Sequence, residues 1–213
     1  MENSTQSNPG TPQQAIQRLK EGNVRFTTGM RSVEPLLSHL KLKDLAQNGQ
    51  TPFAIVLTCS DSRSPVEMIF DQGLGDLFVV RVAGNVVAPS LLASIEFAVA
   101  HFACATVLVL GHTLCGAIDA AVQHSKDPTT PLPSPHLEEL VGRIRPAVER
   151  TLRNNTFDDS DFIHQSTEEN VRRSMHLIVS QSEIVRDQVN LKKLSVQGAI
   201  LDISTGKVGF LDE

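Results

Sequence analysis

Short, continuous apolar runs alternate along this chain with longer segments of helical periodicity. The clearest runs span residues 53–57, 77–80 and 106–110, and a weaker fourth spans 195–201. Runs of this length, rich in Val, Ile and Leu, are typical of strands buried on both faces of a parallel sheet. Because parallel strands are joined by crossovers, the pattern predicts an α/β fold: a mostly parallel central β-sheet flanked by helices.

The segment around Thr11 carries the signals of a helix start. Thr11 suits the cap, Pro12 the first helical position and Gln14 the third. This N-terminal helical arm is expected to end near Gly22. At the other end of the chain, Thr205-Gly206 predicts a turn into an antiparallel C-terminal edge strand over 207–211. The remaining predicted helices span 36–48, 64–72, 90–103, 115–124, 135–152 and 167–190.

The length of 213 residues corresponds to about one domain. Residues 1–10 are polar and are expected to form a disordered tail, followed by a single domain over 11–213. The proline-rich stretch 125–135 and the polar stretch 154–166 are predicted to be loops inside that domain, because the segments on both sides continue the same alternation.

Composition excludes several classes of function. The formal charge of −5 gives no electrostatic basis for binding nucleic acid or an anionic membrane, and Trp and Tyr are both absent. No apolar window reaches the roughly 18 residues of a spanning helix, and the polar N-terminus lacks the features of a signal peptide. A cytoplasmic location is therefore expected. Three cysteines, an odd number, argue against a disulfide framework.

Reactive side chains follow two of the predicted strands. Cys59 comes after the run 53–57, and His112 and Cys115 come after the run 106–110. In an open parallel sheet, ligands bind beyond the carboxyl ends of the strands, so these three residues converge if the strands are neighbours. Two thiolates and an imidazole suit Zn²⁺, and three protein ligands leave a fourth position for water or substrate. The pattern predicts one catalytic zinc ion per chain.

Other cysteine chemistries fit the sequence less well. A cysteine phosphatase loop needs Arg six residues after Cys59, where Pro65 stands, and a Cys-x-x-Cys redox pair would need Cys in place of Ser62. Cys104 lies on an apolar face before a strand and is interpreted as core packing. Core packing of Cys59 alone would be an equally good interpretation, but the spacing of His112 and Cys115 favours a metal site.

Asp61 and Arg63 follow Cys59 at two and four residues. An ion pair between them would keep the carboxylate ionised and would orient it. Asp61 is predicted either to accept a hydrogen bond from the metal's hydroxide or to become the fourth metal ligand. The alternative is a surface salt bridge of little energetic value.

These residues resemble the β-class carbonic anhydrases, most closely the bacterial branch. The family's motifs Cys-x-Asp-x-Arg and His-x-x-Cys-Gly match residues 59–63 and 112–116, and the resemblance covers most of the chain. Ser64 and Leu114 depart from the family's usual valine and usual small or polar residue. Further matching segments are 21–26, 70–85, 94–98, 170–173 and 198–208.

The resemblance implies reversible hydration of CO₂ to bicarbonate and a proton, by attack of zinc-bound hydroxide on CO₂. It implies that Asp61 orients the nucleophile, that Arg63 holds Asp61, and that the Gly116 N–H binds a substrate oxygen. It also implies a homodimer or homotetramer, with the N-terminal helix wrapped around the partner. The candidates for an apolar CO₂ pocket are Val66, Phe70, Val86, Val87 and Leu114.

Two other functions remain open at this point. One is hydrolysis of CS₂ or COS on the same zinc scaffold, which would be decided by access to the pocket. The other is a non-catalytic zinc protein that senses bicarbonate. The bicarbonate switch known in some relatives uses Trp and Tyr, which this chain lacks, so that switch is not expected here.

Overall fold

The computed structural model describes residues 10–30, 39–156 and 161–212, so most of the expected tail and the start of the predicted helix 36–48 lie outside the described residues. One sheet has the strand order β2-β1-β3-β4-β5. The first four strands are parallel, and β5 pairs antiparallel to β4, which confirms the predicted fold class. The strands are β1 (Ala54–Thr58), β2 (Leu77–Arg81), β3 (Thr106–His112), β4 (Ser195–Leu201) and β5 (Val208–Phe210).

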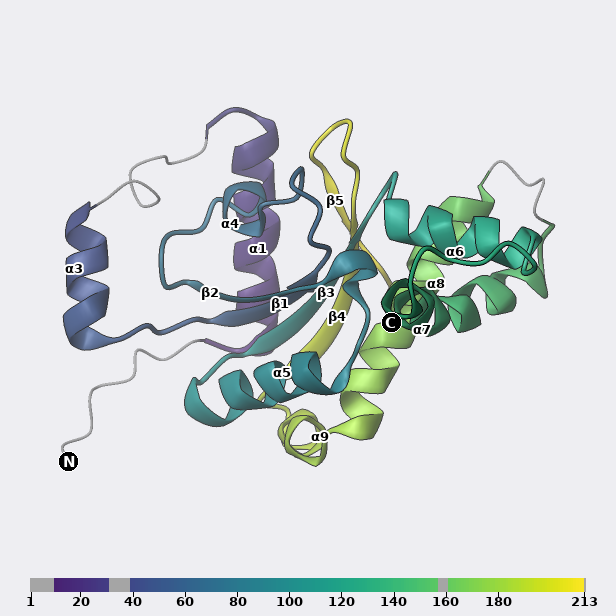
Figure 1. Cartoon of the computed structure of the whole chain (residues 1–213). Helices are drawn as coiled ribbons and strands as arrows, with labels where there is room; N and C mark the ends of the chain where they lie inside the picture. Colours follow the sequence, from purple (N-terminus) through teal and green to yellow (C-terminus); the bar gives the residue numbers. More distant parts are fainter. Residues whose placement is uncertain (1–9, 31–38, 157–160, 213) are drawn as a thin grey trace.

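Helices cover both faces of the sheet and extend beyond one end of it (Figure 1). Helices α6, α7 and α8 pack on one another at the side away from β2. None of the helices in the described part of the chain is long and apolar enough to span a membrane. The helices are α1 (Pro12–Thr27), α3 (His39–Asn48), α4 (Val66–Ile69), the 3₁₀ turn η1 (Ala83–Asn85), α5 (Pro89–His101), α6 (Gly116–Lys126), α7 (Pro135–Leu152), α8 (Phe162–Gln181) and α9 (Glu183–Asn190).

Alternate residues of the buried strands serve two cores. Ala54 and Val56 of β1 pack with α1 and α4 on one face, while Ile55 and Leu57 pack with α5, α8 and α9 on the other. Side chains of a strand alternate between the faces, so a continuous apolar run is what a strand buried on both sides requires. A third core joins α6 and α7 and contains Cys59 and Cys115.

Helix α1 ends later than predicted and packs against the sheet of its own chain. It continues past Gly22 to Thr27, and its Ala15 and Leu19 are buried against its own sheet. This helix therefore packs on the sheet of its own chain, and its predicted contact with a partner subunit stays a prediction. Gly22 does not end the helix; it lets α1 approach the chain at Phe70, whose carbonyl oxygen lies where a Cβ on residue 22 would be.

Substitution of Gly22 by alanine is expected to lower the free energy of unfolding by about 2–3 kcal/mol, because the new methyl group would overlap the Phe70 carbonyl. Urea denaturation of both variants measures the change. Gln17→Ala, on the exposed side of the same helix, is the control and is expected to change stability by at most about 0.5 kcal/mol. Equal stability of Gly22→Ala and wild type would contradict this packing.

Three further boundaries differ from prediction. Helix α8 begins at Phe162, inside the predicted loop 154–166, because Phe162 is buried in the third core. The predicted helix 167–190 is broken at Ser182, whose hydroxyl accepts the Val185 N–H and caps α9. The predicted helix 64–72 contracts to the single turn α4.

Candidate metal centre

Three predicted ligands meet at the carboxyl edge of the sheet. Cys59 follows β1, His112 is the last residue of β3, and Cys115 caps the start of α6. Strands β1 and β3 are parallel neighbours, with Thr58 paired to Leu110, so their ends lie together. The two Sγ atoms and a His112 ring nitrogen all lie within 4.8 Å of one another, and the three residues are buried.

The His112 ring is oriented as a metal ligand would be. Its Nδ1 lies 2.8 Å from the Thr113 carbonyl oxygen. Because a carbonyl only accepts, Nδ1 carries the proton and Nε2 presents its lone pair. Nε2 is buried and has no hydrogen-bond partner among the described residues. A buried acceptor without a partner, beside two thiols, fits a metal ion in the site.

The electrostatics of the two thiols also call for a cation. The hydrogen bond from Cys115 and the one from the Gly84 N–H lower the pKa of Cys59, although burial opposes this. The neighbouring Cys59 thiolate and burial raise the pKa of Cys115. Without a metal the site therefore holds one thiolate and one thiol. A second thiolate requires a positive charge between them, which a divalent ion supplies.

Asp61 and Arg63 form a bidentate ion pair beside Cys59, His112 and Cys115. Arg63 Nε and a terminal nitrogen donate to the two carboxylate oxygens at 3.0 and 2.7 Å, and the Arg63 backbone N–H adds a bond of 2.8 Å. The Arg63 side chain holds the pKa of Asp61 well below its usual range, so the carboxylate is ionised. One of its oxygens lies 3.9 Å from His112 Nε2. In this arrangement Asp61 faces the ligands while Arg63 holds it.

Arg81 and Gly84 also contact the site, although neither was predicted to have a role there. Arg81, the last residue of β2, donates to the carbonyls of Cys59 at 3.0 Å and Asp61 at 2.6 Å. The Gly84 N–H donates to Cys59 Sγ at 3.3 Å. A charged residue at the end of a strand next to β1 was the available signal for Arg81. The Gly84 contact depends on the bend in η1, which has no such signal.

The predicted substrate residues fall into different places. Gly116 is exposed at the first turn of α6, and Val86 packs in the same core as Cys59 and Cys115. Val66 and Phe70 are buried in the core beneath α1, and Val87 is buried in the core beneath α5. Of the four apolar candidates named here, the structure brings only Val86 into the core of the two cysteines.

The two departures from the family pattern lie on either side of the Asp61–Arg63 pair. Ser64 is buried, and its hydroxyl donates to the Asp61 carbonyl at 3.0 Å, a bond that valine could not form. Leu114 has a φ of 57° and a side chain that is 71% exposed, while its carbonyl accepts a 3.1 Å bond from Arg63. Leu114 therefore contributes to holding Arg63 through its backbone.

Comparison with known proteins agrees with this geometry. The family model described as "Carbonic anhydrase" matches residues 54–208. Carbonic anhydrase 2 of Mycobacterium tuberculosis is 35% identical over 201 residues, which cover 94% of this chain and 93% of the relative.

Solved structures show the same fold. A β-carbonic anhydrase of Aspergillus fumigatus superposes with a TM-score of 0.70 at 28% identity, covering 94% of this chain and 90% of that one. Tetrameric β-carbonic anhydrases of Sordaria macrospora include a match with a TM-score of 0.70 at 25% identity, over 81% of this chain and 86% of the other. The chain therefore belongs to the β-carbonic anhydrase family, as its two motifs predicted.

Proposed function

We propose that this enzyme catalyses the reversible hydration of CO₂ to bicarbonate and a proton, with one zinc ion held by Cys59, His112 and Cys115. The observation that carries the proposal is the buried Cys-His-Cys group with an unpartnered Nε2, next to an ionised carboxylate. Family membership supports it, since the relatives are named carbonic anhydrases. Stopped-flow measurement of CO₂ hydration by the zinc-loaded chain tests it.

Bound zinc would lower the pKa of a water molecule and so supply a nucleophile near neutral pH. Asp61 would accept a hydrogen bond from that nucleophile and orient it towards CO₂. The low pKa of Asp61 makes it a poor store for a proton at neutral pH, so the released proton passes to buffer. The Gly116 N–H, at the start of α6, donates to a substrate oxygen, and Val86 forms part of the apolar wall.

Arg63 acts on the reaction through Asp61. Its two side-chain hydrogen bonds to the carboxylate are charge-assisted and bidentate, so they keep Asp61 ionised and fix the orientation of its oxygens. Ligation of the metal by Asp61 would require these bonds to break. We therefore propose Asp61–Arg63 pairing as the working arrangement and direct ligation by Asp61 as the alternative, inactive one.

Zinc affinity is expected to rise with pH between 6 and 8. In the metal-free site the Cys59 thiolate raises the pKa of Cys115. Burial alone would lower the pKa of His112, but the contacts of His112 with Cys59 and with the Thr113 carbonyl raise it. Zinc must displace these protons, so each proton released strengthens binding about tenfold per pH unit. Competition with a chelator of known, pH-corrected affinity measures the slope. An affinity that does not change with pH would contradict the proposed ligands.

Assembly and location follow the same proposal. Relatives in Sordaria macrospora are tetrameric, and we propose a homodimer or homotetramer for this chain, which light scattering after size exclusion would measure. All three cysteines are free, and two of them are proposed as metal ligands. That state suits a reducing compartment, and we propose the cytoplasm.

A further inference from the structure

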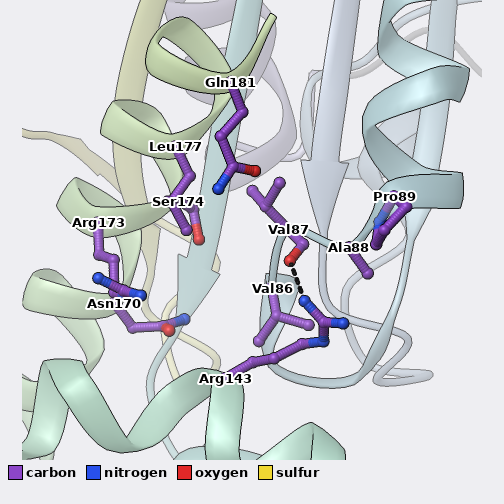
Figure 2. Close-up of a pocket in the computed structure, with 10 residues that line it drawn as sticks. All are labelled: Val86, Val87, Ala88, Pro89, Arg143, Asn170, Arg173, Ser174, Leu177 and Gln181. Carbon is purple, nitrogen blue, oxygen red and sulfur yellow. Dashed lines mark hydrogen bonds between the residues drawn. The ribbon is translucent and has the colours of Figure 1, made fainter.

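A second polar pocket lies between α8, α7 and the segment that leads from η1 into α5 (Figure 2). Its volume is about 260 Å³. Two arginines line it, and the lining contains no acidic residue. The lining residues are Val86, Val87, Ala88, Pro89, Arg143, Asn170, Arg173, Ser174, Leu177 and Gln181.

Arg173 is the least satisfied of these residues. Its Nε is buried and has no hydrogen-bond partner among the described residues, and no described acidic group pairs with its guanidinium. Buried donors in folded proteins almost always have an acceptor, and a guanidinium group remains charged at all accessible pH values. The pocket thus contains a half-buried positive charge with donor capacity to spare.

Arg143 brings a second guanidinium into the pocket from α7. One of its terminal nitrogens donates to the Val87 carbonyl at 3.1 Å, the bond drawn in Figure 2, and the other donates to Glu139 at 2.7 Å. These bonds hold the side chain in place beforehand, so little further ordering is needed when a ligand binds. Glu139 neutralises part of this charge from outside the lining.

The rest of the pocket combines fixed polar groups with an apolar wall. Positions 170, 173, 174, 177 and 181 follow helical spacing, so α8 presents them on one side. Figure 2 shows the Asn170 and Gln181 side chains reaching towards the 86–89 segment, with the Arg173 guanidinium beside Asn170. Asn170 and Ser174 are anchored to the carbonyls of Gly84 and Asn85. Gln181 adds an amide without such an anchor, and Val86, Val87 and Leu177 supply apolar surface.

We propose that this pocket binds a small oxyanion, a carboxylate or phosphate group carried on a short apolar body. Two guanidinium groups match the oxygens of such a group, and no carboxylate in the lining opposes it. The site is separate from the proposed metal ligands and does not depend on CO₂ hydration. Its wall nevertheless touches the metal centre, because Asn170 holds Gly84 and Gly84 donates to Cys59.

The test is titration of the zinc-loaded chain with sodium phosphate and with sodium acetate, each against sodium chloride at equal ionic strength, followed by calorimetry. We expect phosphate, acetate or both to bind. Arg173→Gln is expected to weaken that binding about tenfold or more, since it removes a charge-assisted contact. Arg172→Gln is the matched control: its side chain is exposed and bonds the Asp212 carbonyl, so binding is expected to stay unchanged.

Anion binding at the metal is separated from binding in the pocket by two comparisons. Inhibition of the hydration reaction by the same anions measures anion binding at the metal, and Arg173→Gln is expected to leave that inhibition unchanged.

Arg173→Lys retains the charge without the bidentate geometry and is expected to bind the anion with intermediate affinity. This variant also tests the pocket if Arg173→Gln does not fold. Equal binding by Arg173→Gln and Arg172→Gln, or binding no stronger than chloride, would overturn the proposal.

Discussion

Replacement of Cys59 by serine is expected to remove zinc and CO₂ hydration together. A serine hydroxyl does not ionise near neutral pH, so the site loses the thiolate that is most readily formed. Zinc content is expected to fall from about one ion per chain to less than about a tenth, because protein zinc sites depend on their full ligand set. Hydration by the variant is then expected to be indistinguishable from the buffer background.

Cys104→Ser is the matched control for that substitution. Cys104 is buried at the opposite end of strands β1 and β3 from the proposed metal ligands, and its Sγ donates to the Pro52 carbonyl at 3.2 Å. Burial raises the pKa of its thiol to about 12, which makes it an inert packing residue. This variant is expected to keep its zinc and its activity. Loss of zinc from Cys104→Ser, or full activity in Cys59→Ser, would show that the ligands are assigned wrongly.

Replacement of Asp61 by asparagine is expected to lower kcat/KM for hydration by a hundredfold or more while zinc content stays the same. Asparagine has nearly the same shape, but it lacks the negative charge that strengthens the hydrogen bond from the nucleophile and that holds Arg63. Positioned acid–base groups contribute about 10²–10⁴ in rate. Stopped-flow kinetics combined with metal analysis of the same sample measures both quantities.

The charge of Asp61 predicts the pH behaviour as well. Because Arg63 keeps its pKa well below the usual range, Asp61 stays ionised from pH 6.5 to 9 and its titration is not expected within that interval. Asp44→Asn is the control: this exposed carboxylate accepts hydrogen bonds from Asn48 and Lys41 on its own helix α3, which lies away from α6 in Figure 1. Its loss is expected to leave the rate unchanged. A fully active Asp61→Asn variant would remove Asp61 from the proposed mechanism.

The Cys59–His112–Cys115 group could be predicted from the sequence because its residues lie where strands end. Cys59 and His112 follow uninterrupted apolar runs, and parallel neighbours bring such ends together, so adjacency of β1 and β3 was the single assumption needed. The Asp61–Arg63 pair is equally local, since two residues of one turn form it. Both predictions involve contacts between segments whose order the strand pattern already implies.

The features that were missed depend on contacts between distant parts of the chain. Gly22 looked like a helix end, but its role is to admit the Phe70 carbonyl, 48 residues away in the sequence. The pocket around Arg173 is built from three separate elements, and neither Arg143 nor Arg173 stands out in its own helix. Val66 and Phe70 lie in the core under α1, and their part in a CO₂ pocket stays a prediction. Burial of this kind is set by tertiary packing and not by local spacing.

We propose that zinc at Cys59, His112 and Cys115 makes this chain a CO₂ hydratase. The most direct test is stopped-flow CO₂ hydration from pH 6.5 to 9, with zinc content determined on the same sample. We predict about one zinc per chain, as three protein ligands to one ion require, and hydration well above the buffer rate. Full zinc occupancy without hydration at any pH in this range would contradict the claim and would favour CS₂ or COS hydrolysis, or a non-catalytic zinc protein.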